Sequence, residues 1–403
     1  MLGLPFFVAA LVGASASHPP ACAPALFAGV RTHTGGDAWE RAKELVADGD
    51  GYAEGLPGRT HFAVDLASGA RATTDDLGIA KQRIVTSPAV TWKQDITQGV
   101  HRLDAPDALA KARSEAYIAR NGWFQPTTDP ASFTCLSDAV EDGRPLRVVR
   151  VVPRGGRPVT VWVDPVAHVV VRTEQQAPTQ LEAVHYGAYR SVQGLLLPHE
   201  IIETNGLPEE TAVRSIRTYR VLPSRAAADF VRPAASTNQR ILNGAAFTQV
   251  PADDSSGSPV VDAYVDGHGP LPFILDTGGH AILTADAAKE LGLTAKGGGV
   301  SGGAGEGTIT QQFARVRNLR IGDAEITDFP MFVIPYDKSF SNRGPGKTPL
   351  AGILGLEVFE RFAVTVDYVR HTLRLESPQR YVPPSASVAV PLVFQDDMPL
   401  TYA

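Results

Sequence analysis

Alternation of apolar and polar residues between positions 145 and 222 constrains the fold most strongly. The stretch "LRVVRVVPRGGRPVTVWVDPVAHVVVRTEQ" alternates in this way and is interrupted by turn residues at 154–157 and at 164–165. Because successive side chains of a strand point to opposite faces of a sheet, this pattern buries one face and leaves the other in water. The segment therefore predicts an antiparallel meander of hairpins.

Composition extends this prediction to the rest of the chain. The 403 residues are 43% hydrophobic, enough for two or three domains with their own cores. The 38 glycines and 31 prolines favour many short strands joined by turns. The net charge of −6 argues against a nucleic-acid partner, which usually requires a basic surface. No window contains the roughly 18 apolar residues that a membrane-spanning helix needs, so no transmembrane segment is expected.

The first residues are typical of a secretory signal. An apolar stretch over residues 2–12 precedes small residues at 14–16, which predicts a signal peptide at 1–16 and an exported protein, periplasmic or secreted. The usual positive charge at the start of such a signal is missing, because the first basic residue is Arg31. A buried first strand or a misassigned start codon is the alternative.

The cysteines and histidines give no cofactor or metal prediction. An exported protein with two cysteines can pair them, but the spacing of Cys22 and Cys135 does not show whether it does. Two cysteines are too few for a Cys-rich zinc site. The segment His199–Glu203 lacks the second histidine of a zinc-binding H-E-x-x-H helix and lies in a predicted strand. We therefore expect neither a cofactor nor a bound metal.

The first part of the chain, residues 17–225, is predicted to form a curved antiparallel sheet with one or two helices. Helices are expected at 38–52 and at 105–123, with Asp104 as the N-cap of the second. In strand order this domain resembles the open-barrel folds of outer-membrane lipoprotein carriers. An Ala- and Pro-rich linker is expected at 226–245.

The stretch "LPFILDTGGHAILT" (271–284) places a carboxylate, Asp276, directly after an apolar strand. A carboxylate at the end of a buried strand is costly unless it is paired or used, so Asp276 is a catalyst or a turn residue. A helix is predicted at 285–291, followed by the glycine-rich segment 297–313, and the apolar triplet Ile353-Leu354-Gly355 precedes another helix-like segment.

This order of elements is similar to that of the retropepsin-like aspartyl proteases. The resemblance covers residues 246–380 and implies a mainly β acid-protease barrel lobe, preceded by the antiparallel curved-sheet α+β domain. It implies that Asp276 is the catalytic acid and base, that Thr277 joins an inter-loop hydrogen-bond network, and that Gly278 shapes the loop.

The resemblance also implies supporting residues. Substrate contacts are expected from the loop and the flap, at Gly279, Gly302, Gly303, Ala304 and Gly305. The segment Ile353, Leu354 and Gly355 is expected to thread beneath the loop as structural support. Gly279 departs from the family pattern, which usually has Ser or Ala there, and this loses a hydrogen bond to the acid.

The chemistry of this family needs two facing Asp loops, and the chain contains one Asp-Thr-Gly. A second chain can supply the partner acid through a homodimer of the lobe. Alternatively, a second lobe encoded downstream supplies it, because residues 390–403 echo residues 250–267 and residues 381–403 are predicted to begin such a lobe. The competing interpretation of this segment is an ordinary C-terminal strand.

Two further glycine motifs favour other enzymes only weakly. Residues 299–303 fit the G-x-S-x-G elbow of serine hydrolases, and residues 297–302 fit a dinucleotide fingerprint. Both motifs need a preceding strand and a following helix, whereas here a helix precedes and a strand follows. The leading hypothesis is an aspartic endopeptidase that acts on peptide or protein substrates. Its competitors are a non-catalytic cell-envelope ligand-binding protein with a degenerate protease-like lobe and a serine hydrolase using Ser301.

Overall fold

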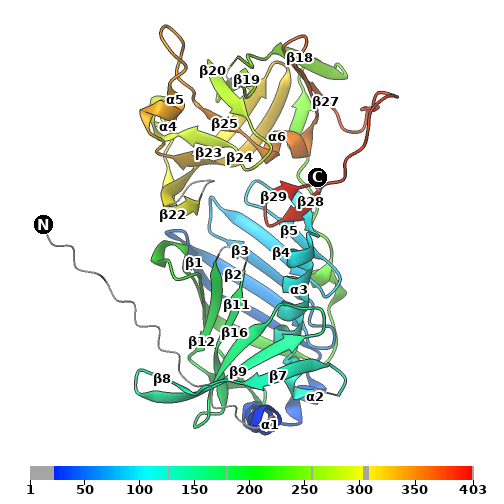
Figure 1. The fold of residues 1–403 in the computed structure, drawn as a ribbon, viewed down its shortest axis with the longest axis vertical. Coiled ribbons are helices and arrows are strands. Elements are labelled where there is room, and N and C mark those ends of the chain that lie inside the picture. The colour runs from blue at the N-terminus through cyan, green and yellow to red at the C-terminus, as the bar shows by residue number, and fades with distance from the viewer. Residues whose placement is uncertain (1–21, 126, 178–179, 256, 303–307, 402–403) are drawn as a thin grey trace, which may run out of the picture.

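A computed structural model shows a mainly β protein, which confirms the predicted fold class (Figure 1). It describes residues 22–125, 127–177, 180–255, 257–302 and 308–401. The predicted signal peptide at 1–16 lies outside the described residues. Figure 1 shows a large curved sheet, drawn mostly in blue to green, and a smaller lobe in yellow to orange beyond one end of it.

The N-terminal part contains one long sheet, antiparallel except where the C-terminal strands join it in parallel at one edge. In sheet order its strands are β29 (Met398–Leu400), β28 (Val393–Gln395), β6 (Val100–Leu103), β5 (Thr91–Gln94), β4 (Lys81–Thr86), β3 (Arg71–Asp76), β2 (Leu56–Asp65), β1 (Glu44–Ala53), β16 (Ala212–Leu222), β15 (Glu200–Thr204), β12 (Leu181–Gly187), β11 (Val169–Gln176), β10 (Val159–Asp164), β9 (Arg144–Pro153) and β7 (Ala131–Cys135). The strand β8 (Ala139–Glu141) pairs with β9, and β13 (Arg190–Val192) and β14 (Leu195–Leu197) form a separate hairpin.

The predicted alternation produces the buried face of this sheet. Val159, Val161 and Val163 of β10 are at most 1% exposed, while the residues between them are partly exposed. Both hairpins predicted around 154–157 and 164–165 are confirmed by the pairing of β10 with β9 and β11.

The helices of this part are α1 (Cys22–Thr34), α2 (Ala38–Arg41), α3 (Pro106–Ala119) and the 3₁₀ turns η1 (Gly122–Phe124) and η2 (Pro208–Glu210). The helix predicted at 105–123 is confirmed as α3, but Asp104 does not cap it, because its carboxylate accepts from the Phe394 backbone. The helix predicted at 38–52 is wrong beyond Arg41, since β1 pairs with β2 along its whole length and with β16 as far as Tyr52. Cross-strand pairing outweighs the local helix propensity there.

The second part is a lobe built on an eight-stranded sheet with a three-stranded sheet beside it. The large sheet has the order β17 (Gln239–Ile241), β24 (Ala324–Ile334), β21 (Ile282–Thr284), β25 (Gly352–Leu354), β20 (His268–Leu275), β19 (Val260–Val265), β23 (Thr308–Ile321) and β22 (Lys296–Gly302). The small sheet contains β18 (Phe247–Pro251), β27 (Thr372–Glu376) and β26 (Ala363–Asp367), and the helices are α4 (Ala285–Glu290), α5 (Lys338–Ser341) and α6 (Leu356–Arg361).

One apolar core holds this lobe together. Phe273, Leu283 and Leu354, from three adjacent strands of the large sheet, are fully buried in it. The predicted helix at 285–291 is confirmed as α4, and the Thr284 hydroxyl caps it by accepting from the Ala287 backbone. These contacts fix the strands that surround Asp276.

Two segments join the parts. The predicted linker contains the 3₁₀ turn η3 (Ala227–Phe230), whose Asp229 carbonyl accepts from Arg83, and then β17, which pairs with β24. The hairpin β28–β29 joins the N-terminal sheet, since Phe394 pairs with Leu103 in parallel. The described residues do not test whether residues 381–403 begin a second lobe. Among the described residues, no helix is long and apolar enough to cross a membrane.

Candidate functional site

The loop that carries Asp276 leaves the end of β20 and turns back into β21. The Asp276 amide donates to the Leu354 carbonyl at 3.0 Å, and the Asp276 Oδ1 accepts from the Gly278 amide at 2.8 Å. Asp276, Thr277 and Gly278 are all exposed. The premise that Asp276 is buried is therefore wrong: the sheet core ends at Leu275, and the turn carries the carboxylate out into solvent.

The apolar triplet 353–355 lies directly beside this loop. β25 runs parallel to β20, with Ile353 opposite Ile274 and Leu354 opposite Leu275. Beyond it, the Leu356 amide donates to the Gly279 carbonyl at 2.8 Å. A Cβ on Gly355 would lie 2.2 Å from that same carbonyl oxygen, so only glycine fits. The chain thus fastens the loop from both sides through backbone contacts.

A buried ion pair, His280 with Glu357, also holds the loop. Glu357 of α6 is 0% exposed; its Oε1 lies 2.9 Å from His280 Nδ1, and its Oε2 accepts from the Ala281 amide at 2.6 Å. Burial lowers the pKa of His280, but its hydrogen bonds to Asp397 and Glu357 outweigh this and hold the pKa well above its usual value. No sequence pattern predicted this pair. The only sequence signals were a histidine four residues after Asp276 and a glutamate two residues after Gly355.

A cleft of about 910 Å³ opens over Asp276 between the two parts of the molecule. The lobe lines it with Asp276, Gly278, Gly279 and residues of the β22–β23 hairpin, and the N-terminal part lines it with residues that include Lys93, Gln180 and Asn205. Tyr336 is another lining residue, and its pKa is raised by burial and by the negative charge of Asp276. The carboxylate therefore faces a hollow that is large enough for a ligand.

The hairpin β22–β23 takes the place of the predicted flap. Val300, Ile309 and Gln311 line the cleft. Gly302 is the last residue of β22, whereas Gly303, Ala304 and Gly305 lie outside the described residues. The predicted substrate contacts of these four residues remain predictions.

The N-terminal part holds this hairpin through two glutamates. The Gly298 amide donates to the Glu54 carbonyl at 2.7 Å, and Gln311 donates to the Glu54 carboxylate at 3.2 Å. Burial raises the pKa of Glu54, and Glu210 adds to the effect. Burial also raises the pKa of Glu210, although a hydrogen bond from the Val300 backbone opposes this. Both glutamates line the cleft and are more readily protonated than free glutamates.

The inter-loop network that the resemblance implies for Thr277 stays a prediction, because the described residues contain no second, facing loop of this kind. Thr277 is exposed, and its hydroxyl makes no hydrogen bond to any residue that the structure describes. In the resembling family this hydroxyl pairs with a second, facing loop. Within the described ranges the only Asp-Thr-Gly is the one at 276–278.

Asp397, on the turn of the hairpin β28–β29, lines the far side of the cleft. Its carboxylate lies 2.5 Å from Lys93 Nζ, 2.7 Å from His101 Nε2 and 3.3 Å from His280 Nε2. Burial raises the pKa of Asp397, but Lys93 and the two histidines outweigh it and hold the pKa well below its usual value. Asp397 is therefore firmly ionised and paired.

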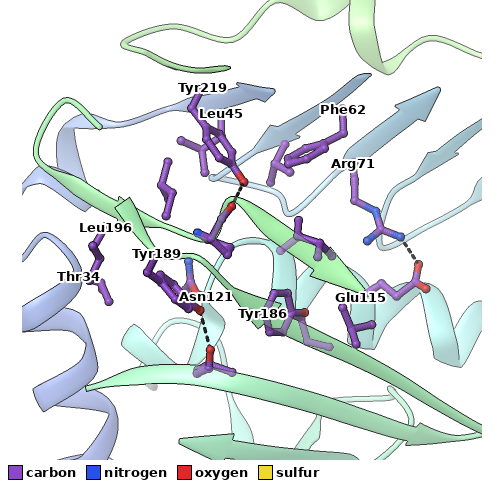
Figure 2. Close-up of a pocket in the computed structure, with 18 of the residues that line it drawn as sticks. Thr34, Leu45, Phe62, Arg71, Glu115, Asn121, Tyr186, Tyr189, Leu196 and Tyr219 are labelled. Atoms are coloured by element: carbon purple, nitrogen blue, oxygen red, sulfur yellow. Dashed lines mark hydrogen bonds and ion pairs between the residues drawn. The ribbon is translucent and has the colours of Figure 1, made fainter. Parts of the chain in front are cut away.

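A separate apolar cavity of about 210 Å³ lies within the N-terminal sheet. Figure 2 shows Leu45, Phe62, Leu196, Tyr186 and Tyr189 around it, with the Arg71–Glu115 pair at one side. The Tyr219 hydroxyl donates to the Pro198 carbonyl at 2.6 Å and the Tyr189 hydroxyl to the Val170 carbonyl at 2.6 Å. The polar tips of these rings are thus satisfied, and their apolar faces remain available to a ligand.

Comparison with known protein families supports a protease-like lobe. Residues 261–358 match the family model described as aspartyl protease. The match begins in β19 and ends in α6, so it contains Asp276 and the triplet 353–355. No curated protein is similar enough to the chain to count as a match.

Solved structures that are similar to this chain include several cell-envelope proteins. A LolA superfamily protein from Nitrosomonas europaea is 14% identical over 52% of this chain and 97% of its own, with a TM-score of 0.37. A putative outer membrane lipoprotein-sorting protein domain from Vibrio parahaemolyticus is 11% identical over 51% of this chain and 95% of its own, with a TM-score of 0.36. The MucA/MucB complex of Pseudomonas aeruginosa is 12% identical over 78% of this chain and 94% of its own, with a TM-score of 0.21.

Proposed function

We propose that this protein is an aspartic endopeptidase whose lobe supplies one of two catalytic carboxylates, Asp276. The observation that carries the proposal is the position of Asp276: it lies on a loop fastened by β25 and α6, and its carboxylate faces the cleft over which the β22–β23 hairpin lies. The match of residues 261–358 to the aspartyl protease family supports it.

The reaction follows from two carboxylates held close together. Two such groups cannot both ionise, so one retains a proton. The ionised carboxylate takes a proton from a water molecule between them, and the protonated one polarises the scissile carbonyl. The water oxygen then attacks the carbonyl carbon without a covalent enzyme intermediate. In this scheme Thr277 and Gly278 position the loop, and Gly279 and the hairpin glycines contact the substrate backbone.

The second carboxylate comes from another Asp loop, in a second copy of the chain or in a further lobe. The N-terminal part and the hairpin β28–β29 line the cleft opposite Asp276, so a second loop reaches Asp276 only when this wall moves aside. Glu54 and Glu210 already line the cleft and have raised pKa values. They are the intramolecular alternative to a second loop.

The test is peptide cleavage at acidic pH by the full chain, with a peptide library and a transition-state inhibitor of aspartic peptidases. Asp276→Asn is expected to reduce kcat/KM by at least about 10³-fold, with an unchanged melting temperature because the carboxylate is exposed. Asp262→Asn is the matched control, since Asp262 is an exposed acid on the neighbouring strand β19. Equal activity of the two variants would disprove the role of Asp276.

The source of the partner acid is tested separately. If a second copy supplies it, specific activity rises with protein concentration, and mixing an excess of Asp276→Asn chains into the wild type lowers it. If Glu54 supplies it, specific activity does not depend on concentration and Glu54→Gln abolishes it. Either outcome leaves the role of Asp276 to the first test.

A second function is favoured by the cavity in the N-terminal sheet. We propose that it binds an apolar ligand, because aliphatic and aromatic side chains line it. Leu196 is a cavity-lining residue that is only partly buried, so Leu196→Trp fills the cavity with little damage to the core. This variant is expected to lose the binding of a fluorescent fatty-acid probe. Unchanged probe binding would disprove the assignment.

We also propose that the protein acts outside the cytoplasm. The apolar signal at residues 1–16 motivates this, and Cys135 is disulfide-bonded, as is usual in oxidising compartments. The side chain of Cys22 lies outside the described part, so whether Cys22 pairs with Cys135 stays open, as it does from the sequence. Fractionation of cells that express the full chain tests the location.

A further inference from the structure

Two carboxylates from different parts of the molecule meet beside the cleft, each with one oxygen that lacks a hydrogen bond. Asp95 follows β5 and is 2% exposed, and Glu360 belongs to α6 of the lobe. Asp95 Oδ2 and Glu360 Oε2 are buried and have no hydrogen-bond partner among the described residues. Buried carboxylate oxygens in this state are costly, and they call for a positively charged partner between them.

The turn after β5 presents the Asp95 oxygen in a fixed direction. Asp95 Oδ1 accepts three hydrogen bonds, from the Thr97 amide at 2.7 Å, the Thr97 hydroxyl at 2.8 Å and the Gly99 amide at 3.0 Å. The other oxygen is therefore held toward Glu360. The absence of a side chain at Gly99 allows the two carboxylates to lie close together. A Cβ there would lie 1.8 Å from Glu360 Oε2 and 2.8 Å from Asp95 Oδ2.

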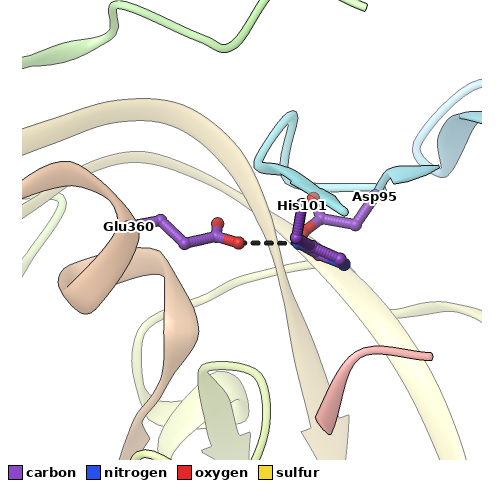
Figure 3. A group of neighbouring side chains, drawn as sticks. All are labelled: Asp95, His101 and Glu360. Carbon is purple, nitrogen blue, oxygen red and sulfur yellow. Dashed lines mark hydrogen bonds and ion pairs between the residues drawn. The ribbon is translucent and has the colours of Figure 1, made fainter. Parts of the chain in front are cut away.

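A nitrogen donor completes the group. His101 of β6 lies beside the two carboxylates, with Nδ1 2.9 Å from Glu360 Oε1, and one potential ligand atom from each of Asp95, His101 and Glu360 lies within 4.8 Å of the others. Figure 3 shows the imidazole and Asp95 facing Glu360 across the boundary between β5–β6 and α6. Ligand atoms about 2.1 Å from a tetrahedral zinc ion lie roughly 3.4 Å apart, so small side-chain rotations bring the three into place.

The surroundings of His101 match those of a metal-bound histidine. A ligating imidazole usually donates its second N–H to a carboxylate, and here His101 Nε2 lies 2.7 Å from Asp397 Oδ1. The ring also stacks on Phe394 with 5.0 Å between the ring centroids, which fixes its plane. A cavity of about 360 Å³ adjoins His101 and Glu360 and provides an entry path.

The neighbouring cation Arg361 does not fill this position. Its Nη1 is 3.7 Å from Glu360 Oε2, while its nitrogens donate to the Asn238 side chain at 2.9 Å and to the Thr97 carbonyl at 2.5 Å. The guanidinium is thus oriented toward other acceptors.

We propose that Asp95, His101 and Glu360 bind a zinc ion that cross-links the N-terminal sheet to the protease-like lobe. The mixed set of one imidazole and two carboxylates suits zinc, and the fourth position is left for water. Calcium and magnesium prefer oxygen ligands alone, which separates them from this site. The expectation from the sequence that the chain has no metal site is revised accordingly, because the ligands come from segments far apart in the chain.

The test is a zinc titration of the full chain after treatment with a chelator, followed by competition with a chromophoric zinc indicator. Although burial lowers the pKa of His101, hydrogen bonds to Asp397 and Glu360 raise it to about 9, so the titration is run at mildly alkaline pH. We expect one equivalent of bound zinc, a rise in melting temperature, and no competition by a millimolar excess of magnesium.

Asp95→Asn is the decisive variant. Its amide oxygen still accepts from Thr97 and Gly99, so the turn keeps its hydrogen bonds, while the ligand oxygen is replaced. We expect zinc affinity to fall at least about 100-fold in this variant and in Glu360→Gln, with metal-free melting temperatures no lower than that of the wild type. His61→Ala removes a partly exposed His–Asp pair between β2 and β1 and is expected to keep full affinity.

Cobalt gives a second measurement that does not depend on stability. Bound Co²⁺ in a four-coordinate nitrogen and oxygen site absorbs visible light, and this band is expected in the wild type and absent in Asp95→Asn. The proposal is overturned if the wild type binds no stoichiometric zinc, or if Asp95→Asn and Glu360→Gln bind it as tightly as the wild type. In that case a shared proton joins the two carboxylates.

Discussion

The ion pair between Glu357 and His280 leads to the sharpest stability prediction. Replacing Glu357 by Ala leaves the Ala281 amide without its acceptor and the His280 imidazolium without one of its two carboxylates. Removing one partner of a buried ion pair costs about 3–5 kcal/mol. Because Glu357 is 0% exposed, water cannot take its place as an acceptor. We therefore expect Glu357→Ala to lower the unfolding free energy of the lobe by this full amount.

The assay is chemical denaturation of the full chain, followed by a probe in the lobe. Glu357→Gln is the control: it keeps the shape and one acceptor for Ala281 and removes only the charge, so its loss is expected to be smaller than that of Glu357→Ala. A loss of less than about 1 kcal/mol in Glu357→Ala would refute the view that this pair fixes the loop.

The dependence of this stability on pH has a definite sign. The folded pKa of His280 is above its unfolded value, since the hydrogen bonds that its imidazolium donates to Asp397 and Glu357 outweigh burial. Its contribution is therefore complete below the unfolded pKa of about 6.5 and is lost as the pH rises through the raised folded value. The wild type is expected to lose more stability over this range than Glu357→Gln does.

Three further predictions concern packing and covalent contacts. Gly355→Ala is expected to lower the unfolding free energy of the lobe by about 1–3 kcal/mol, because its Cβ would meet the Gly279 carbonyl at 2.2 Å. Gly279→Ala, whose Cβ would meet nothing within 4 Å, is expected to stay within about 0.5 kcal/mol, and equal effects of the two would disprove the packing argument. Leu354→Ala, at a fully buried position, is expected to cost about 2–5 kcal/mol by denaturation. Cys135→Ser is expected to lower the stability of the N-terminal part by about 2–4 kcal/mol, and reducing agent should destabilise the wild type but not this variant.

Local sequence patterns predicted most of the strands around Asp276. The apolar run before the loop, the following helix and the triplet 353–355 are each marked by a pattern within a short stretch of sequence. Periodicity and turn residues were therefore enough to predict them. The helix predicted at 38–52 failed because Leu45, Val46 and Ala47 are buried by partners in β2 and β16 that no local pattern reveals.

The polar contacts between the two parts could not be predicted in the same way. Asp397 meets His101 and His280 from segments far apart in the chain, and no spacing rule connects them. The exposure of Asp276 was also missed, since a one-residue difference in where a strand ends decides whether a side chain points into a core or into a cleft. Both the long-range polar contacts and the exposure of Asp276 depend on tertiary structure and not on local secondary-structure propensity.

The parallel pairing of β20 with β25 has a consequence for the order of folding. Ile274 and Ile353 become neighbours only after the whole intervening chain has been synthesised, and such non-local contacts form slowly because loop closure must come first. During synthesis Asp276 therefore leaves the ribosome long before its backbone support exists. Pulse-labelling hydrogen exchange should find the Asp276 amide, which donates to Leu354, among the last in the lobe to be protected. A nascent chain therefore carries the Asp276 loop without its backbone support until the lobe is complete.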